Sequence, residues 1–400
     1  MSRKKILFIH HLSVIGGATK SLLALANASR NKGFDVTILF YGDKGNAYEW
    51  FASQGLECHN FPGGQVFQHA NGAYIPIMQK RPYRVITIFY NAITSIDNTK
   101  SVISSFSPDL VYLNTSLLFP AAMAAKQLNI KVVWHLREQI HSGLFGIRKM
   151  FIMYCFQNFS DKVIAISRTN AAKIKANNTE VIYNSCNSEW QGSKSDLIAL
   201  KSKLKITDER IICFLGGNVR SKGADFLLET IKSIKKTSVN FVVVIAGKFS
   251  LDGPNLNKTE KKVKNILDHD PDLFKYIRFI GVLEDVSTLL KLSKILVWPA
   301  STSHFARPII EAMMNETVVL ASDFESSREI INHGVTGFLA KRSVPVFSKE
   351  LIELLEAENV EVVANAREKA VRLFSQNLNL QRNTQVILDT INQKDFYERG

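Results

Sequence analysis

Hydrophobic residues occur in short runs along the first half of the chain, separated by longer segments of mixed polarity. Most runs are almost continuously apolar and rich in Val, Ile, Phe and Tyr, which is typical of strands buried on both faces by helices. The segments between them have apolar residues at helical spacing, as in residues 18–33, where Gly33 indicates a helix stop. This alternation predicts βαβ units and a parallel, doubly wound sheet. The predicted strands are residues 5–10, 34–41, 109–114, 131–136 and 162–167.

The same alternation restarts in the second half of the chain. Between the two series, residues 181–196 are polar and rich in turn-forming residues, as expected of a linker. A length of 400 residues also exceeds what one ordinary core supports. The sequence therefore predicts two Rossmann-like domains joined near residue 190, with a cleft between them. The predicted strands of the second series are residues 211–216, 241–247, 277–282, 295–300, 317–322 and 337–340.

Two segments do not fit this alternation. Residues 60–84 show no clear period, which predicts a mobile loop or an excursion from the sheet. Residues 143–159 are apolar and aromatic, with Arg148 and Lys149 near their start. They form either an amphipathic helix on a membrane surface or a helix packed on the sheet, and the sequence leaves both open.

Cysteine usage and the amino terminus favour a cytoplasmic protein. The apolar run at residues 6–9 is followed by two histidines, so it predicts a first strand rather than a signal peptide. No stretch approaches the roughly 18 apolar residues of a membrane span. The cysteines lie apart without CxxC spacing, which indicates reduced thiols and neither a zinc site nor a disulfide framework. They are Cys58, Cys155, Cys186 and Cys213.

Positive charge is concentrated in the first half of the chain. Residues 1–190 hold 20 Lys and Arg against 10 Asp and Glu, a balance of +10, and residues 191–400 hold 30 against 26, a balance of +4. A basic half suits an anionic partner, whether a membrane surface, a phosphorylated substrate or nucleic acid, although ordinary solvated lysines would give the same balance. Neither a zinc-finger spacing nor a basic stripe interleaved with aromatic residues is present, so no nucleic acid is expected as a partner.

Two glycine-rich turns lie between a predicted strand and a predicted helix. Gly16 and Gly17 follow the first strand, where the backbone can approach a ligand beside a helix amino terminus. The full G-x-G-x-x-G fingerprint is missing, so dinucleotide binding is weakly indicated and a plain tight turn is the alternative. In the second half, Arg220 and Lys222 belong to the glycine-rich turn 216–223, and cations beside such a turn suit a diphosphate. A solvated loop with incidental basic residues is the alternative for this turn.

Residues 303–314 place an acid between two predicted strands. The strand 295–300 ends just before them, and Pro308 fits the first position of a helix. Glu311 is then expected in the first turn of that helix, at the carboxyl edge of a parallel sheet, where open α/β folds bind ligands. A carboxylate there can accept hydrogen bonds from a pair of sugar hydroxyls. The alternative is an acid that only offsets the helix dipole.

Together these motifs resemble those of the retaining glycosyltransferases of family 4, which have the GT-B fold. The matching stretches are GGA with the following LL, the histidine in KVVWHLRE, KG after the first strand of the second domain, and RPIIEAMM followed by VVLASDFESSREIINHGVTGFL. The resemblance is strongest over residues 295–340 and weakest over residues 45–100. It implies an α/β protein whose two Rossmann-like domains face each other across a cleft. The implied parts are an acceptor-side domain over 1–188, a nucleotide-sugar domain over 189–375 and a helix in 376–400 that packs back on the first domain.

The resemblance also implies roles for individual residues. Gly16 and Gly17 match the loop that approaches the donor diphosphate, and His135 matches a histidine that contacts the donor sugar. Lys222 matches the phosphate-binding lysine, and Glu311 matches the second acid of an E-x7-E motif, which holds ribose. The expected catalytic residues are His135, Arg220 and Lys222, and the rest of the expected donor site is Gly16, Gly17, Gly217, Ser303, Phe305, Ala306, Arg307 and Glu311. Asp323 and Glu329 lie in a loop and helix that resemble the family pattern.

Two positions depart from that pattern. The first acid of E-x7-E should stand eight residues before Glu311, and this chain has Ser303 there. In the family that acid contacts hydroxyls of the donor sugar, so its loss puts the sugar, or the activity itself, in doubt. The second departure is Gly217, which replaces an arginine, although Arg220 could supply the missing charge. Both departures touch the reactive end of the donor more than its nucleotide end.

The sequence thus predicts a cytoplasmic transferase, peripheral at the inner face of the membrane, that uses a nucleotide-sugar donor. The acceptor would be a glycan or a lipid-linked sugar of a surface polysaccharide or lipopolysaccharide, and configuration would be retained. No cofactor and no metal ion are expected, because the cations can neutralise the leaving diphosphate. Two alternatives stay open: a sugar-nucleotide epimerase of the same fold, and a catalytically impaired member acting as a binding or scaffold subunit, which Ser303 favours.

Overall fold

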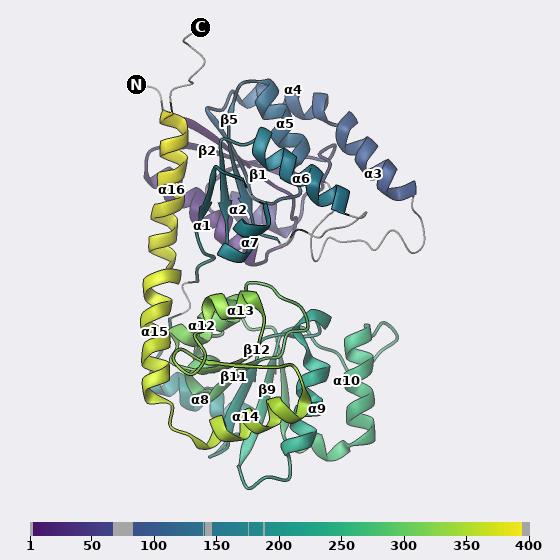
Figure 1. The fold of residues 1–400 in the computed structure, drawn as a ribbon, viewed down its shortest axis with the longest axis vertical. Helices are drawn as coiled ribbons and strands as arrows, with labels where there is room; N and C mark the ends of the chain where they lie inside the picture. Colours follow the sequence, from purple (N-terminus) through teal and green to yellow (C-terminus); the bar gives the residue numbers. More distant parts are fainter. Residues whose placement is uncertain are drawn as a thin grey trace. The chain divides into compact units, whose positions relative to one another are not determined.

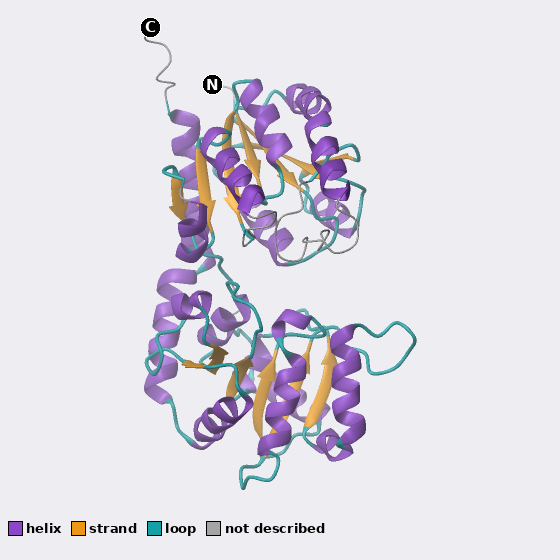
Figure 2. Cartoon of the chain, turned by 45° about the vertical axis from the view of Figure 1, so that its right-hand side comes forward, coloured by secondary structure: helices purple, strands orange, loops and turns teal. Residues whose placement is uncertain are grey.

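The chain folds into two α/β units in the computed structural model. Unit 1 comprises Met1–Tyr183 and Asn377–Gly400, and unit 2 comprises Asn184–Gln376. The boundary lies inside the segment 181–196 that was expected to be a linker. Each unit contains one parallel sheet covered by helices (Figures 1 and 2), so the predicted α/β class is confirmed. The structure describes residues 3–66, 83–138, 140, 146–174, 176–186 and 189–393.

Unit 1 is built on a seven-stranded sheet in the order β3-β2-β1-β4-β5-β6-β7, with parallel pairing throughout. Successive residues of β1 enter different core clusters, Leu7 and Ile9 in one and Ile6 and Phe8 in another. A strand covered by helices on both faces shows this alternation, which explains its continuous apolar run in the sequence. The strands are β1 (Lys5–His10), β2 (Asp35–Tyr41), β3 (Glu57–Phe61), β4 (Leu110–Leu113), β5 (Lys131–Leu136), β6 (Lys162–Ala165) and β7 (Thr179–Val181).

The helices that cover this sheet include one from the far end of the chain. In α16, Val386 and Ile387 belong to the same core cluster as Ile6 of β1. Asn379 donates from its amide to the carbonyl of Tyr183 at 2.8 Å. The carboxyl-terminal segment therefore completes the core of unit 1. The helices are α1 (Gly17–Asn31), α2 (Asn46–Ser53), α3 (Tyr83–Thr94), α4 (Ile96–Phe106), α5 (Phe119–Gln127), α6 (Ile147–Asn158), α7 (Arg168–Ile174) and α16 (Gln376–Asn392).

Unit 2 is built on a six-stranded parallel sheet in the order β10-β9-β8-β11-β12-β13. Leu227 of α9 and Leu351 of α14 pack in one cluster with Ile212 of β8, which places part of the core between these helices and the sheet. The strands are β8 (Arg210–Phe214), β9 (Phe241–Ala246), β10 (Ile277–Gly281), β11 (Ile295–Trp298), β12 (Val318–Ser322) and β13 (Phe338–Ala340). The helices are α8 (Lys194–Leu204), α9 (Ala224–Ile234), α10 (Lys258–His269), α11 (Ser287–Leu292), α12 (Arg307–Met314), α13 (Glu325–Ile330), α14 (Val344–Glu356) and α15 (Val360–Phe374), with 3-10 turns η3 (Arg220–Lys222) and η4 (Pro271–Lys275).

The sequence pattern missed two strands, and both lie at an edge of the unit 1 sheet. β3 has the sequence ECHNF and β7 has TEV, and neither strand contains a buried residue. An edge strand has a neighbour on one side only and often carries polar residues, so no apolar run marks it. Within the segment 60–84, β3 ends at residue 61 and α3 begins at residue 83, while residues 67–82 lie outside the described residues.

In each unit the strand order reverses at one point. The reversal lies between β1 and β4 in unit 1 and between β8 and β11 in unit 2. At such a switch point the segments that leave the two strands diverge to opposite faces, and ligands of open α/β sheets bind there, beyond the carboxyl ends of the strands. The fold therefore predicts ligand sites at the loops after β1 and β4 in unit 1 and at the loops after β8 and β11 in unit 2.

None of the four cysteines, all of which lie in described ranges, forms a disulfide, and Cys58 is the one that is not fully buried. Within the described ranges, none of the helices is both long and apolar enough to cross a membrane. No group of three or more His, Cys, Asp and Glu side chains in the same ranges is arranged to hold a metal ion.

Candidate functional site

The turn after β8 is shaped by a close approach of backbone segments. Gly217 has a φ of +51°, and Gly247, which follows β9, has a φ of +117°. A Cβ on Gly247 would lie 2.8 Å from the Cα of Gly217, and one on Gly217 would lie 3.0 Å from the carbonyl oxygen of Lys248. Glycine is therefore favoured at both positions by conformation and by space. An arginine in place of Gly217 would not fit without moving the loop after β9.

Gly223 closes the same turn against the end of β11. Its φ is +84°, and a Cβ there would lie 2.2 Å from the carbonyl oxygen of Pro299. The amide of Ser301 donates to the carbonyl of Ser221 at 2.8 Å, so backbone atoms join η3 to the loop after β11 across the switch point. Arg342 donates from Nε to the carbonyl of Pro299 at 3.1 Å and supports the same corner. The two predicted cations of η3 are thereby held at the carboxyl edge of the sheet.

Lys222 is the more buried of these two cations. Its Nζ lies 5.5 Å from the ring centroid of Trp298, within the range of a cation–π interaction. Burial lowers the pKa of Lys222, and the charge of the nearby Glu311 acts in the opposite direction. An ammonium group that has lost part of its water is suited to take up an anion such as phosphate. Arg220, at the start of η3, is exposed.

Glu311 lies further into its helix than the sequence predicted. α12 begins at Arg307 after the N-cap residue Ala306, so Pro308 is the second helical residue and Glu311 the fifth. The prediction of a first-turn acid was wrong. It took Pro308 as the first helical residue, but proline fits the second position as well, because the backbone N–H groups at the first two positions have no partner inside the helix. Beyond the first turn the dipole effect fades, so the dipole explains this acid less well. Its side chain is 15% exposed, and Arg307 Nη2 lies 4.0 Å from its Oε1.

Ser303 makes a local contact in the position where the family pattern has an acid. Its hydroxyl donates to the hydroxyl of Ser326 at 2.9 Å, and Ser326 is a buried residue of α13. This bond joins the loop after β11 to the helix after β12. Phe305 packs on Phe374, with ring centroids 6.0 Å apart, and Ala306 is buried. The stretch between β11 and α12 is therefore fixed by packing on both sides.

The remaining residues of this motif are held by neighbours of their own. Asp323 accepts two hydrogen bonds from Arg328, at 2.6 and 2.7 Å, and this pairing lowers the pKa of Asp323. Glu329 is half-buried on α13. His304, which the sequence analysis did not single out, lies with its ring 5.7 Å from that of Trp298. Burial lowers the pKa of His304, so the ring is neutral near pH 7.

In unit 1 the predicted glycine turn is less constrained. Gly16 is the N-cap of α1 with extended backbone, and no described atom lies within 4 Å of the place where its Cβ would be. Gly17 is the first residue of α1 and is exposed. Neither conformation nor packing requires glycine at position 16, and a ligand close to the helix amino terminus stays the predicted reason for it.

His135 lies near the end of β5 as predicted, but its ring is only 4% exposed. Its Nδ1 lies 2.6 Å from the hydroxyl of Tyr112, which donates to Oδ1 of Asn383 at 3.2 Å, so Nδ1 carries the proton. Nε2 is buried and has no hydrogen-bond partner in the described part of the chain. Burial, with the charge of Arg137, holds the pKa of His135 well below its usual value. The described contacts are those of a core residue, and the contact with a donor sugar stays a prediction.

A chain of hydrogen bonds that the sequence analysis missed crosses the switch point of unit 1. Arg137, just after β5, donates from Nε to Oδ1 of Asn114 at 2.8 Å, and Nδ2 of Asn114 lies 3.1 Å from Nδ1 of His10. Nε2 of His10 lies 3.3 Å from Oγ1 of Thr19, whose hydroxyl donates to the carbonyl of Val14 at 2.9 Å. Buried side chains thus connect the end of β5 to the glycine turn after β1. We refer to these four side chains, Arg137, Asn114, His10 and Thr19, as the unit 1 relay.

Glu138 organises the loop after β4 beside this relay. It accepts hydrogen bonds from the Thr115 hydroxyl at 2.7 Å, the Ser116 hydroxyl at 2.7 Å and the Ser116 amide at 3.0 Å. Burial lowers the pKa of the neighbouring His11, and the charge of Glu138 acts in the opposite direction. A polar and partly charged group of side chains therefore lies at the carboxyl edge of the unit 1 sheet. In the sequence, this group could have been found from the polar residue that follows each of three predicted strands.

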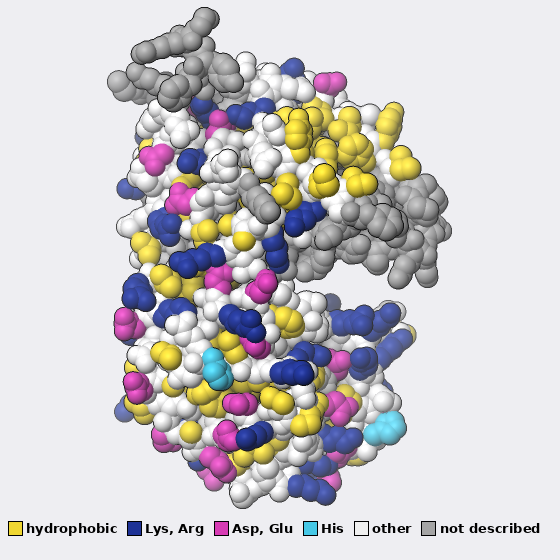
Figure 3. Space-filling view, viewed as in Figure 1, with side chains coloured by type: hydrophobic (Ala, Val, Ile, Leu, Met, Phe, Trp, Pro, Cys, Tyr) yellow, Lys and Arg dark blue, Asp and Glu magenta, His cyan; other side chains and the backbone are white. Residues whose placement is uncertain are grey.

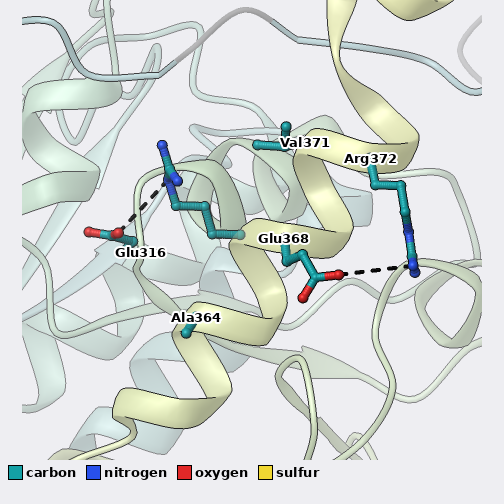
Figure 4. A pocket seen from close by; sticks show the side chains of 6 residues that line it. Glu316, Ala364, Glu368, Val371 and Arg372 are labelled. Atoms are coloured by element: carbon teal, nitrogen blue, oxygen red, sulfur yellow. Dashed lines mark ion pairs between the residues drawn. The ribbon is translucent and has the colours of Figure 1, made fainter.

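The pocket in Figure 4 lies at the opposite edge of the unit 2 sheet. Glu316 follows α12 and precedes β12, which places it at the amino edge. Nε of Arg367 lies 3.8 Å from Oε1 of Glu316, and Nη1 of Arg372 lies 4.0 Å from Oε1 of Glu368. Charged groups in this pocket therefore pair with one another. The pocket is distinct from the carboxyl-edge residues described above. It measures about 440 Å³ and is lined by Glu316, Ala364, Arg367, Glu368, Val371 and Arg372.

Comparisons with known families match both units. Residues 15–190 match the family model described as Glycosyltransferase Family 4, and residues 198–388 match the model described as Glycosyl transferases group 1. A protein of Haemophilus influenzae, described as an uncharacterized glycosyltransferase, is 23% identical over 350 residues. That alignment covers 85% of this chain and 87% of the relative.

Solved structures share the fold over nearly the whole chain. Anabaena HepE, solved in complex with UDP and glucose, superposes with a TM-score of 0.75 at 19% identity and covers 96% of this chain and 100% of its own. A glycosyltransferase from Rickettsia africae superposes with a TM-score of 0.78 at 17% identity and covers 98% of this chain and 100% of its own. At these identities the likeness concerns the fold, and it confirms the predicted GT-B architecture of two Rossmann-like units.

Proposed function

We propose a specific transfer reaction for this chain, which belongs to the family 4 glycosyltransferases of the GT-B type. The protein would move a sugar from a nucleotide-sugar donor to a glycan or lipid-linked acceptor, and the sugar would keep its configuration. The observation that carries the proposal is the presence of Lys222 and Glu311 beside the switch point of unit 2. A partly desolvated ammonium suits phosphate, and a nearly buried carboxylate suits hydroxyl groups. A nucleoside diphosphate sugar carries both.

The donor contacts follow from these two side chains. Lys222 and Arg220 would stabilise the negative charge that develops on the leaving diphosphate, which is the largest catalytic contribution open to such a site. Glu311 would accept hydrogen bonds from two ribose hydroxyls. Anabaena HepE has been solved with UDP and with UDP-glucose, and we therefore take UDP as the first nucleotide to test. The proposal includes no metal ion and no cofactor, since the cations of η3 supply the positive charge.

For the acceptor we propose a sugar of a surface polysaccharide or lipopolysaccharide, made on the cytoplasmic side of the membrane. WaaG, which has been solved with the same fold, is described as a glycosyltransferase involved in lipopolysaccharide biosynthesis. Unit 1 would serve the acceptor and unit 2 the donor. A lipid-linked acceptor requires that the enzyme work at a membrane surface, and unit 1 has a surface suited to that.

An exposed apolar surface on α3 and α6 supports membrane attachment. α6 lies inside the segment 143–159, for which the sequence left open a helix on a membrane surface or a helix packed on the sheet, and residues 143–145 fall outside the described residues. Its Ile152, Cys155 and Phe156 pack in the core of unit 1, while other side chains of the helix are exposed. Phe89 of α3 packs edge-on against Phe151 of α6, with ring centroids 5.2 Å apart, so the two helices are neighbours. Figure 3 shows hydrophobic side chains gathered over this part of unit 1. The exposed apolar side chains are Ile86, Phe89, Tyr90, Ile93, Ile147, Met150 and Tyr154.

The same two helices carry no acid, which favours an anionic membrane. Lys149 of α6 is half-buried and can reach a surface, whereas Arg148 is buried. We expect vesicles with acidic lipid to bind the protein and rising salt to release it. Met150→Glu should abolish binding, whereas the control Val360→Glu, at an exposed apolar residue of unit 2, should leave it unchanged. Equal binding to neutral vesicles, or equal binding by both variants, would contradict the membrane assignment.

The assay for transfer also separates the alternatives. A panel of sugar nucleotides is incubated with the protein and extracted membrane lipid, and release of free nucleotide is measured. Transfer requires release that depends on the lipid and falls at least about tenfold in Glu311→Ala, since charge-assisted hydrogen bonds contribute roughly 1.5–3 kcal/mol. Nucleotide binding without release would favour the binding or scaffold subunit that Ser303 suggests. Conversion of the donor sugar without any acceptor would favour the epimerase.

A further inference from the structure

His304 lies in the loop between β11 and α12, directly after Ser303. Its Nδ1 lies 3.0 Å from the carbonyl oxygen of Thr302. A carbonyl oxygen can only accept, so Nδ1 carries the proton of the neutral ring and Nε2 presents a lone pair. Among the described residues, none forms a hydrogen bond with Nε2. The backbone thus fixes the tautomer of His304 and leaves an acceptor nitrogen that no described residue uses.

The surroundings of His304 keep its ring neutral. Burial lowers its pKa most, the carbonyl of Thr302 acts in the opposite direction, and the positive charge of Lys222 lowers the pKa further. The ring packs against Trp298 with centroids 5.7 Å apart, and Nζ of Lys222 lies 5.5 Å from the centroid of the same Trp298 ring. An ammonium group and a neutral hydrogen-bond acceptor therefore adjoin one buried indole at the carboxyl end of β11.

Lys222 interacts with both Glu311 and His304. The charge of Glu311 acts to raise the pKa of Lys222, and the charge of Lys222 acts to lower the pKa of His304. Lys222 is therefore within electrostatic range of both side chains. A nucleotide sugar has its groups in a corresponding order, with the diphosphate between the ribose and the transferred sugar. With phosphate at Lys222 and ribose at Glu311, His304 is the acceptor that is left for the sugar.

Ser303 and His304 differ in what they can offer to a sugar. The hydroxyl of Ser303 donates to that of Ser326 at 2.9 Å, so its proton is used within the protein. His304 is half-buried, so part of the residue is accessible to a ligand. Its Nε2 can accept a hydrogen bond as a carboxylate oxygen does, but without a negative charge. Such an acceptor can bind a sugar hydroxyl without repelling the diphosphate beside it.

We propose that Nε2 of His304 accepts a hydrogen bond from a hydroxyl group of the transferred sugar, which makes His304 a specificity-determining residue of the donor site. The proposal rests on the proposed glycosyl transfer, because the sugar reaches His304 only as part of a nucleotide-sugar donor. Lys222 would hold the phosphate and His304 the sugar. A neutral acceptor at a fixed position favours sugars with a hydroxyl that points toward it, and a sugar that leaves the nitrogen unpaired binds less well.

The test compares sugar nucleotides with the nucleotide alone. UDP, UDP-glucose, UDP-galactose and UDP-N-acetylglucosamine are each titrated into the full chain by calorimetry, and circular dichroism confirms that each variant is folded. His304→Ala removes both ring nitrogens. His304→Asn keeps an amide donor for the Thr302 carbonyl but removes Nε2, whereas His304→Gln keeps an acceptor oxygen near the place of Nε2. The matched control is His269→Asn, at an exposed histidine of α10 whose Nδ1 also lies 2.7 Å from a backbone carbonyl oxygen.

His304→Ala and His304→Asn should weaken at least one of the three sugar nucleotides by about three- to tenfold and leave UDP binding unchanged, because one neutral hydrogen bond to the sugar is lost. His304→Gln should retain more of that affinity. If His304 only holds its loop through Thr302, His304→Asn should instead behave as the parent does, and His304→Ala should weaken UDP as well. That pattern overturns the proposal. So does a His304→Ala variant that binds all four probes as the parent and His269→Asn do.

Failure of the proposed function would look different. If GDP or ADP binds the parent in place of UDP, the same comparison is made between that nucleotide and its glucose conjugate. A parent that binds none of the nucleotides and none of their sugar conjugates would contradict the donor site of unit 2, and the role of His304 with it. Lys222→Gln serves as the converse variant, because it should weaken the nucleotide and its sugar conjugates alike. The same uniform loss in His304→Ala would overturn the assignment of His304 to the sugar while the donor site stands.

Discussion

The switch points of the two sheets are crossed by different kinds of groups. In unit 2 the crossing is made by backbone of η3 and of the loop after β11, and the charged side chains of Lys222 and Glu311 lie beside it. In unit 1 the crossing is made by the buried neutral side chains of His10 and Asn114, and Arg137 adds one charge at the rim. Equivalent places in the two sheets therefore differ in the groups that span them, which are backbone atoms in unit 2 and buried neutral side chains in unit 1.

The two switch points should also differ in the interaction free energy that ligand binding adds. Lys222 is a partly desolvated cation, so binding an anion returns favourable interactions that burial removed. The unit 1 relay is already a complete chain of hydrogen bonds, and such a network mainly preserves geometry. Substitutions beside the unit 2 switch point should therefore act on ligand affinity. Substitutions in the relay should act on stability as well as on affinity.

The largest expected effect contrasts the glycines of the two turns. Gly223→Ala adds a Cβ 2.2 Å from the carbonyl oxygen of Pro299 at a φ of +84°, so the free energy of unfolding should fall by about 3 kcal/mol or more. Gly16→Ser meets open space and supplies a good N-cap residue, so stability should change by less than about 0.5 kcal/mol. Urea denaturation of both variants measures this contrast. Similar losses in the two variants would show that the turns are equally constrained.

The second contrast lies within the proposed donor site of unit 2. Glu311→Ala should reduce transfer about 10- to 150-fold, because it removes charge-assisted hydrogen bonds worth roughly 1.5–3 kcal/mol. Ser303→Ala removes a neutral hydroxyl bonded to Ser326, so its effect should stay within about tenfold. Ser303→Glu should also lower activity, by desolvation and by repelling the donor phosphates. Initial rates of transfer by all three variants measure these effects. A large increase in Ser303→Glu would show instead that the parent is a weakened transferase.

The strands and the candidate site residues could be predicted from the sequence to a different extent in the two units. Strands covered on both faces were predicted from their apolar runs, and the short edge strands β3 and β7 were not, because edge strands carry polar residues. The unit 2 residues lie in two compact motifs, so Lys222 and Glu311 could be named in advance. His10, Asn114 and Arg137 are spread over more than a hundred positions of the chain. They meet only because β1, β4 and β5 are neighbours in the sheet, which sequence spacing does not reveal.

The smallest expected effect is the acid response of the buried histidines of unit 1. Burial holds the pKa values of His10 and His135 well below 6.5, whereas in the unfolded chain they take up protons near pH 6.5. The unfolded state then binds more protons, so stability is fully present above pH 6.5 and is lost as the pH falls toward the folded-state pKa values. Each ring contributes a slope of at most about 1.4 kcal/mol per pH unit.

Replacing one ring checks this response. His135→Gln should flatten the dependence of the free energy of unfolding on pH between 7 and 5.5, while its amide can still donate to Tyr112. The control is His269→Gln, at an exposed histidine of α10, which shows whether loss of the buried ring in particular changes the slope. Urea denaturation at several pH values gives both slopes. A parent whose stability does not fall with acid would show that these rings are not held neutral.

Nucleotide binding without metal tests the proposed donor site of unit 2 most directly. UDP, GDP and ADP are titrated into the full chain by calorimetry in the presence of EDTA. At least one should bind, and at about 100 times its Kd it should stabilise the folded protein by roughly 2.7 kcal/mol. Lys222→Gln and Glu311→Gln should each weaken that nucleotide at least about tenfold, with Arg3→Gln unchanged. If none of the three binds, or if both variants bind as the parent does, the assignment of the donor site is contradicted.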